Sequence, residues 1–423
     1  MTLNPPARPV VILGYDAVSP LGTEFDTQWR RLLAGRSGIG PLTRFDPPPD
    51  FPVSVAGQVA DIDTAPYPFL SPRSLALWPS PIFKYAMLVV HRALEKSGIT
   101  ITPDLAPRVA VTFSSAVGGQ DAVLHADRRL LKEGKLPPPY ANPNSCINMV
   151  SGKISMLTGA TGPIMSTITA CATGVTSIIT GSMLIQSGQA DVAICGAVDF
   201  PLVEPIVAGF ATMNAAYQAR AESTEPPQRA SRPFSLGRRG FVISEGAGAV
   251  ILASAEFARV QGLDPRIAVA GWGMTADAAH YVAPRLATVI SCMAAAIDRA
   301  GISAHDVRFV NAHAASTKVG DRVEFQALEA IFGKHLPPVS ANKSMLGHAM
   351  GAASALESVF TLKGMQAGRI PPTINYHPDP QLDPQSRLDC VPAGWRRQDQ
   401  EFVLKNAFGF GGCNAALVFQ RMA

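Results

Sequence analysis

The stretch KYAMLVVHRALEKSGITITPDLAPRVAVTFSSAVG, residues 84–118, has a counterpart at residues 286–320, LATVISCMAAAIDRAGISAHDVRFVNAHAASTKVG. Each stretch predicts, in the same order, an amphipathic helix, a glycine-isoleucine turn, a short acidic loop, a buried strand and a segment of small residues. A repeat of this length indicates two related α/β halves that pack on each other. We place these halves at residues 1–255 and 256–423.

A shorter parallel also suggests duplication. Residues 145–160, SCINMVSGKISMLTGA, and residues 343–358, KSMLGHAMGAASALES, each begin with polar residues and continue as a helix of small residues. We expect these two segments to be equivalent parts of the two halves. Three proline-rich segments, at residues 46–50, 136–140 and 371–392, are expected at the surface or around the mouth of a site.

The composition is that of a globular enzyme with much buried surface. Apolar residues make up 47% of the chain and charged residues only 16%, and this shortage of charge indicates a large interface between subunits. The net charge of +4, without a basic run, does not indicate nucleic-acid binding, although it suits an acidic protein partner.

The chain predicts a cytoplasmic protein that is not bound to a membrane. Its first residues, MTLNPPARPVVILGYD, lack the basic segment and apolar core of a signal peptide, and no apolar span of about 18 residues occurs. The six cysteines are scattered and form no CxxC pair, so we expect neither disulfides nor a metal site.

The motif TACATG, residues 169–174, places Cys171 ahead of a helix of small residues. Unpaired backbone N–H groups and the positive end of the helix dipole favour a thiolate there, which is the form that nucleophilic catalysis requires. The alternative is a buried structural cysteine, which is the commoner role of a lone cysteine.

Two histidines lie in motifs that suit the same chemistry. His313, in NAHAAST, follows the strand-like run VRFV, and open α/β sheets bind ligands at such strand ends. His348, in KSMLGHAMGA, stands at the head of a helix, five residues after Lys343. Two imidazoles that donate N–H to one thioester carbonyl can stabilise the enolate left by departing CO2. Taken singly, either histidine is more often structural, so the hypothesis depends on the combination.

The glycine-rich segment NAFGFGGCN, residues 406–414, lets backbone amides approach a ligand closely and complete an oxyanion hole with the Cys171 N–H. Together with TACATG, NAHAAST followed by GDRVE, KSMLGH and RPFSLGRRGFVISEGAGA (residues 232–249), it resembles the elongating beta-ketoacyl-acyl carrier protein synthases. The resemblance spans almost the whole chain. It implies the thiolase-like fold, an α/β fold of five layers, α-β-α-β-α, made of two duplicated halves, in a homodimer.

The resemblance also implies roles for individual residues. The family's Cys-His-His triad falls on Cys171, His313 and His348. In such enzymes the nucleophile takes an acyl group from the phosphopantetheine arm of an acyl carrier protein, and malonyl-carrier protein then loses CO2 to give the attacking enolate. No further cofactor is implied. The implied supporting groups are the oxyanion-hole amides of Cys171 and Phe410, an ion pair of Lys343 with Glu324, Thr317 on the pantetheine arm, and Phe210, Val117, Phe410 and Gly411 at the acyl pocket.

The chain departs from the family pattern at several positions. Ala314 and Ala315 stand where the family has Gly-Thr, so one hydroxyl expected to hold the pantetheine is missing. Ser235 and Arg239 occupy acidic positions of the central signature, so two carboxylates are lost. Cys413 replaces a threonine, which we interpret as a packing substitution.

The surface that receives the carrier protein is also altered. Residues 71–87, SPRSLALWPSPIFKYAM, are largely apolar where the family has several basic residues. Docking is therefore expected to rely on basic residues elsewhere, or else this apolar segment contacts a second protein. The candidate docking residues are Arg73, Lys84, Arg128, Arg129, Lys132, Lys135, Arg220 and Arg229.

The leading hypothesis is an acyltransferase that performs decarboxylative Claisen condensation in fatty acid, polyene or polyketide synthesis. It acts as a homodimer, or as a heterodimer with a subunit like the chain-length factors. The alternative is a non-catalytic partner of that kind, but chain-length factors lack the cysteine that this chain retains. The KSMLGH motif disfavours a coenzyme A thiolase.

Overall fold

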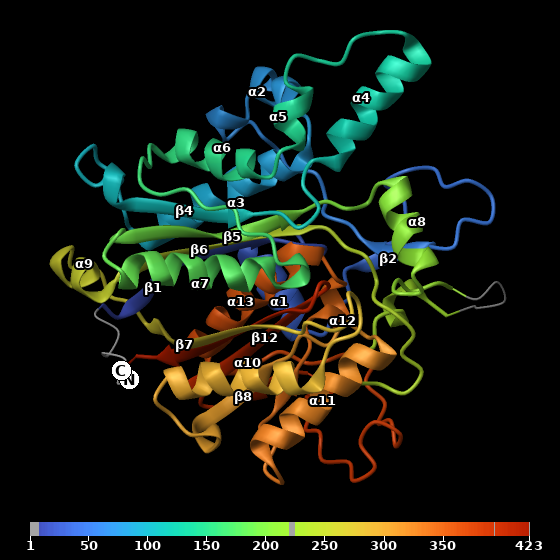
Figure 1. Ribbon diagram of the computed structural model, residues 1–423, viewed down its shortest axis with the longest axis vertical. Coiled ribbons are helices and arrows are strands. Elements are labelled where there is room, and N and C mark those ends of the chain that lie inside the picture. The colour runs from blue at the N-terminus through green and yellow to red at the C-terminus, as the bar shows by residue number, and fades with distance from the viewer. Residues whose placement is uncertain (1–7, 220–224, 393, 423) are drawn as a thin grey trace.

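Helices and strands alternate in layers through the molecule (Figure 1). The computed structural model describes residues 8–219, 225–392 and 394–422. Within them the main sheet has nine strands in the order β4-β5-β6-β1-β7-β13-β12-β8-β9. These strands are β1 (Val10–Val18), β4 (Val109–Ser114), β5 (Val192–Asp199), β6 (Gly246–Ser254), β7 (Ile267–Ala276), β8 (Val307–Asn311), β9 (Val339–Ser340), β12 (Phe402–Gly409) and β13 (Cys413–Arg421).

The sheet consists of two parts with the same topology. In the first part β4 is parallel to β5, and β6 is antiparallel to both β5 and β1. In the second part β8 is parallel to β12, and β13 is antiparallel to both β12 and β7. A short antiparallel pairing of β1 with β7, at residues 10–12, joins the two parts. The predicted duplication is thus visible in the strand topology, whereas the division at residues 255 and 256 stays a prediction.

Three helical layers cover the two parts of the sheet (Figure 1). One outer layer packs on the first part, the opposite outer layer packs on the second part, and a middle layer contacts both. This is the α-β-α-β-α arrangement that the resemblance implied. The helices are α3 (Pro81–Ser97) and α6 (Asn148–Thr158) in the first outer layer, α7 (Thr173–Gln186) and α13 (Met350–Ala367) in the middle, and α10 (Leu286–Arg299) and α11 (Lys318–Phe332) in the second outer layer.

Smaller elements complete the described chain. None of the helices in residues 8–219, 225–392 and 394–422 has the length and apolar composition that a bilayer-spanning helix needs. The remaining helices and strands are α1 (Phe25–Leu33), β2 (Ile39–Pro41), β3 (Val55–Gly57), α2 (Pro72–Leu77), α4 (Gln120–Glu133), α5 (Ala141–Ser145), α8 (Glu204–Thr212), α9 (Ala255–Val260), α12 (Lys343–Leu346), β10 (Arg369–Ile370) and β11 (Arg396–Arg397).

The long sequence repeat is confirmed, and the short one is wrong. Residues 84–118 form α3 and β4, and residues 286–320 form α10, β8 and the start of α11. Residues 145–160, however, form α6 against α3, whereas residues 343–358 lead through α12 into the middle layer. Small residues occur in both helices, but α13 is buried almost throughout and α6 only in part, so composition alone could not separate the two layers.

The helices α7 and α13 pack closely where both begin. A Cβ atom added at Gly174 would lie 2.3 Å from the backbone nitrogen of Ala355. The Gly174 N–H donates to the Ser354 hydroxyl oxygen at 3.1 Å, which ties the two helices together. Because both helix starts border the site described below, this contact fixes the two halves of the site relative to each other.

Gly174→Ala is expected to lower the free energy of unfolding by about 1–3 kcal/mol, because the added methyl group requires α13 to move. Gly152→Ala on α6 is the matched control, since nothing lies within 4 Å of a Cβ at that position. The control should raise the free energy of unfolding by about 0.5–1 kcal/mol. Denaturant titration measures both values, and equal effects would contradict the close packing of α7 on α13.

Candidate active site

Cys171 lies in one 3-10 turn, η3 (Ala170–Ala172), that leads directly into α7. Ala170 has a positive φ of 47°, which turns the chain sharply before the cysteine. The hairpin of β12 and β13 packs against this turn, and a Cβ on Gly409 would lie 2.4 Å from the Thr169 carbonyl oxygen. Only glycine permits this approach. Cys171 is consequently only 8% exposed.

Two histidines from the second half of the chain meet Cys171. His348, between α12 and α13, places its Nε2 atom 3.1 Å from Cys171 Sγ. His313 lies two residues beyond the end of β8, and its ring centroid is 5.6 Å from that of His348, at an interplanar angle of 81°. Phe241 packs edge-on against His348, and Phe408 packs likewise against His313. The three groups predicted to act together are therefore adjacent.

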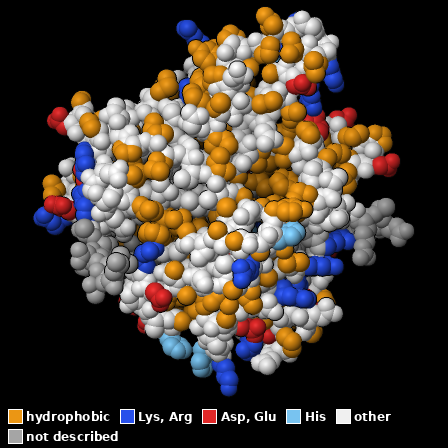
Figure 2. Space-filling view, in the orientation of Figure 1, with side chains coloured by type: hydrophobic (Ala, Val, Ile, Leu, Met, Phe, Trp, Pro, Cys, Tyr) orange, Lys and Arg blue, Asp and Glu red, His pale blue; other side chains and the backbone are white. Residues whose placement is uncertain are grey.

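A cavity of about 280 Å³ reaches all three side chains. In Figure 2 hydrophobic side chains gather in a hollow next to α8, and the residues that follow α8 line this cavity. The lining is Cys171, Met213, Asn214, Ala215, Phe241, His280, Val282, Ala283, Pro284, His313, Ala315, Thr317, Lys318, Val319, Gly320, Val323, His348, Phe408, Gly409 and Phe410.

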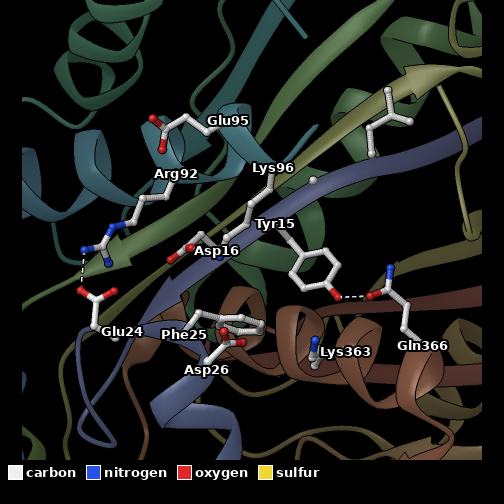
Figure 3. Close-up of a pocket in the computed structure, with 12 residues that line it drawn as sticks. Tyr15, Asp16, Glu24, Phe25, Asp26, Arg92, Glu95, Lys96, Lys363 and Gln366 are labelled. Atoms are coloured by element: carbon white, nitrogen blue, oxygen red, sulfur yellow. Dashed lines mark hydrogen bonds and ion pairs between the residues drawn. The ribbon is translucent and has the colours of Figure 1, made fainter. Parts of the chain in front are cut away.

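A larger polar cavity, of about 590 Å³, lies beside the stretch of β1 that follows its pairing with β7 (Figure 3). Its lining shares no residue with the cavity at Cys171. Tyr15 donates its hydroxyl hydrogen to Gln366 at 2.5 Å, and Arg92 pairs with Glu24 at 2.6 Å. Its lining contains no cysteine or histidine, so we assign the chemistry to the smaller cavity.

Burial raises the pKa of the Cys171 thiol to about 11. The ammonium group of Lys343 and the backbone N–H groups of Phe410 and Cys171 oppose this shift but do not cancel it. The resting thiolate expected from the helix N-terminus is therefore wrong, because the closed surroundings outweigh the helix end. Both amides nevertheless point at the sulfur, as an oxyanion hole formed by Cys171 and Phe410 requires.

The surroundings of both histidines favour the neutral imidazole. Burial lowers the pKa of His313 and of His348 well below the usual value, and the ammonium groups of Lys343 and Lys405 lower both further. The Nδ1 atoms of the two rings have no hydrogen-bond partner in the described part of the chain. The tautomer with its proton on Nε2 leaves no buried donor unpaired, and in His348 it directs that proton toward the sulfur.

Buried ion pairs lie behind the histidines. Lys343 donates to one carboxylate oxygen of Glu357 and to the carbonyl oxygen of His313, both at 2.6 Å. Lys405 donates to the other oxygen of Glu357 at 2.7 Å. Glu357 and Lys405 were not among the residues predicted from the sequence. The available signal was that each charge stands in a stretch of mostly apolar and small residues, within ASALESVF on α13 and FVLKNAF on β12.

Glu324 does not form the ion pair with Lys343 that the resemblance implied. Its carboxylate accepts the backbone N–H groups of His313 and Ala314, at 2.9 and 2.7 Å, and the side-chain amide of Asn406 at 3.0 Å. The partner of Lys343 lies on α13, whereas α11 carries Glu324 to the loop after β8. Glu324 therefore holds the backbone of His313 in place.

Three residues predicted at the acyl pocket are absent from the cavity lining. Phe210 and Val117 pack in a neighbouring apolar cluster, and Phe410 borders both that cluster and the cavity. Gly411 instead donates its N–H to the Tyr281 carbonyl oxygen at 2.7 Å. Phe210, Val117 and Gly411 therefore do not line this cavity, and their role at the acyl pocket stays a prediction, because Phe410 stands at the border of the cavity and of the neighbouring cluster.

The motif residues Ala315 and Thr317 line the cavity, whereas Cys413 does not. Ala315 lines the cavity and offers no hydroxyl there. Thr317 lines it too, and its hydroxyl oxygen accepts the Gly320 N–H at 3.1 Å as the N-cap of α11. Cys413 begins β13 and is outside the lining, so Cys171 is the sole thiol that borders the cavity.

The predicted docking residues are scattered over several elements. Arg128, Arg129 and Lys132 lie on α4, which projects from the body of the molecule (Figure 1). Arg128 already pairs with Glu204 at 3.2 Å, and Lys84 pairs with Asp61 at 3.2 Å. Of the others, Arg73 lies on α2, Lys135 follows α4, Arg229 ends a 3-10 turn, and Arg220 is outside the described residues.

Comparison with known proteins agrees with this geometry. Residues 7–258 match the family described as "Beta-ketoacyl synthase, N-terminal domain", and residues 267–377 match "Beta-ketoacyl synthase, C-terminal domain". The chain therefore belongs to the beta-ketoacyl synthase family. It is an enzyme of the condensing, acyl-transferring class.

Individual relatives cover the whole chain. The "3-oxoacyl-[acyl-carrier-protein] synthase 2" of Coxiella burnetii is 37% identical, over 98% of this chain and 99% of its own. The solved structure of "The ishigamide ketosynthase/chain length factor" is 31% identical with a TM-score of 0.88, and covers 99% of this chain and 100% of its own. A type II PKS ketosynthase solved with its acyl-carrier protein is 26% identical with a TM-score of 0.88, and covers 98% of this chain and 100% of its own.

Alkylation of Cys171 by iodoacetamide is expected to accelerate about tenfold per pH unit from pH 6 to pH 9, without a plateau, because the pKa of this thiol is raised to about 11. Quantifying the modified Cys171 peptide by mass spectrometry measures this rate. The exposed Cys146 in the same digest shows that the reagent is active at each pH. A plateau near neutral pH would mean that the thiolate is already the resting form.

Proposed function

We propose that the chain joins an acyl group, held on Cys171 as a thioester, to the two-carbon unit of malonyl-acyl carrier protein by decarboxylative Claisen condensation. The products would serve fatty acid, polyene or polyketide synthesis. The observation that supports this most directly is the contact of the Cys171 thiol with the imidazole of His348, which packs against the imidazole of His313 in the same cavity. The alternative, a non-catalytic partner of a synthase, needs no such arrangement.

The first step transfers the acyl group to Cys171. Its sulfur attacks the thioester of acyl-carrier protein, a new C–S bond forms, and the C–S bond to the pantetheine breaks. The proton of the Cys171 thiol ends on the pantetheine sulfur. The His348 N–H stabilises the developing thiolate from 3.1 Å, while the amides of Cys171 and Phe410 receive the oxyanion of the tetrahedral intermediate.

The second step uses both histidines. His313 and His348 donate N–H to the thioester oxygen of malonyl-carrier protein, the bond to the carboxylate breaks, CO2 leaves, and the electron pair forms the enolate. The enolate carbon then attacks the acyl thioester on Cys171. A C–C bond forms, the C–S bond breaks, and the released thiolate takes a proton from solvent.

Mass spectrometry after incubation with acyl-carrier protein is expected to show one acyl adduct on Cys171, which Cys171→Ala abolishes. His313→Ala and His348→Ala should keep the adduct but decarboxylate malonyl-carrier protein about 10²–10³-fold more slowly, because each lacks one donor to the enolate oxygen. Absence of the adduct on the unaltered protein would favour the non-catalytic alternative. Undiminished decarboxylation in both histidine variants would overturn the triad.

An acyl carrier protein is the proposed partner of this reaction. The type II PKS ketosynthase noted above was solved in complex with one. On this chain the projecting helix α4 offers Arg128, Arg129 and Lys132 to an acidic surface. The exposed Leu77 of α2 borders the same groove as α4 and would add an apolar contact.

We further propose that two copies associate along the β4 edge of the sheet. β4 is the last strand on that side, and the segment along its outer edge, bridged at Val111 and Ile164, exposes apolar side chains. Such an edge is seldom left uncovered. A heterodimer with a subunit like the chain-length factors is the alternative, as the name of one relative suggests. The exposed side chains of this segment are Ile164, Met165 and Ile168, and Met156 on α6 and Met183 on α7 are exposed as well.

A further inference from the structure

Lys405 is a fully buried lysine in the middle of an apolar strand, β12. Its ammonium donates to Glu357 at 2.7 Å and to the carbonyl oxygen of Asn406 at 2.6 Å. A buried ammonium is costly unless it is paired and hydrogen-bonded, so its presence here calls for a specific reason. Burial lowers its pKa to about 8, which still leaves it charged at neutral pH.

The charges around Lys405 balance. The two lysines, Lys343 and Lys405, share the carboxylate of Glu357, one on each oxygen. Glu324 adds the second negative charge: burial raises the pKa of its carboxyl group, but the hydrogen bonds from Ala314, Asn406 and His313 and the ammonium of Lys405 oppose this shift. Two positive and two negative charges therefore lie behind the histidines, with no net charge.

His313 is held between the two sides of this cluster. Its carbonyl oxygen accepts from Lys343 at 2.6 Å, and its N–H donates to Glu324 at 2.9 Å. Loss of one lysine would leave a buried net negative charge directly behind the ring. A buried negative charge attracts a proton to the nearest basic group, and here that group is an imidazole.

We propose that Lys405 is a positioning residue whose ammonium balances Glu324 and Glu357, so that His313 and His348 stay neutral while malonyl-carrier protein is decarboxylated. This inference rests on the proposed function. An imidazolium would carry a proton on Nδ1 with no acceptor within reach in the described chain, and its ring would be drawn toward the carboxylates. The charge of Lys405 thus sets the lowest pH at which the N–H groups of neutral His313 and His348 support decarboxylation.

The sign of the effect follows from the groups that face the imidazoles. The ammonium of Lys405 lowers the pKa of both histidines, so its removal raises them and shifts the acidic limit of decarboxylation to higher pH. The other charged or titratable groups around the site are Lys343 on α12, Glu357 on α13, Glu324, Asp321 and Lys318 on α11, His280, Arg238, Cys171 and Asp199.

The test compares the pH dependence of malonyl-carrier protein decarboxylation in the unaltered protein and four variants. Lys405→Met and Lys405→Gln both remove the charge, and the second keeps a donor for Glu357 should the first not fold. Lys405→Arg keeps the charge. The double variant Lys405→Met with Glu357→Gln removes one charge of each sign and restores neutrality. We expect the lowest pH at which decarboxylation proceeds to rise by about one pH unit, a tenfold change in proton affinity, in Lys405→Met and Lys405→Gln only.

A second readout does not depend on turnover. Selective ¹³C labelling of the eight histidines, with His313→Ala and His348→Ala for assignment, reports the titration of each ring by NMR. In Lys405→Met and Lys405→Gln, at least one of the two rings should titrate about one pH unit higher than in the unaltered protein. In the double variant, its titration should return to that of the unaltered protein. Unchanged titration of both rings would overturn the role of Lys405. If the unaltered protein forms no acyl adduct, the proposed function fails, yet this titration still decides the charge argument.

Discussion

The whole site depends on keeping one thiol and two imidazoles uncharged in buried surroundings. Burial raises the pKa of Cys171 and lowers the pKa values of His313 and His348, so all three groups favour their neutral forms. Neutral N–H groups can stabilise a forming enolate without binding the carboxylate that must leave. The balanced cluster of Lys343, Lys405, Glu324 and Glu357 lies behind them, outside the cavity lining.

The duplication of the fold explains how these groups come together. Cys171 lies two residues before the start of α7, and His348 lies two residues before the start of α13. These two helices form the middle layer, between the two equivalent parts of the sheet. The nucleophile and its neighbouring imidazole therefore occupy corresponding positions in the two halves. Close packing at Gly174 keeps the two helix starts in contact.

Local motifs were sufficient to predict two related α/β halves and to single out the three reacting groups, whereas the five layers were implied by the family resemblance. The repeat at residues 84–118 and 286–320 predicted α3 with β4 and α10 with β8, because each pattern of apolar residues is satisfied by its own helix and strand. Cys171, His313 and His348 were identifiable because each stands at the end of such an element.

The remaining features depend on packing between segments distant in sequence. Lys343 pairs with Glu357 instead of Glu324 because α13 brings that carboxylate beneath it. The thiolate prediction for Cys171 considered the helix end but not the hairpin that closes over the turn at Gly409. Phe210 and Val117 pack beyond Phe410, which sequence motifs cannot show. Lys405 carried a signal, a charge within an apolar strand, but its partners were not readable from the chain alone.

In the proposed mechanism both imidazoles donate N–H to the same carbonyl oxygen. A crystal structure with a malonyl-pantetheine analogue, in which an amide replaces the thioester so that it cannot decarboxylate, tests this most directly. The analogue's carbonyl oxygen is expected to lie about 2.7–3.2 Å from Nε2 of both His313 and His348. A carbonyl oxygen bound elsewhere, or by only one ring with the other turned away, would contradict it.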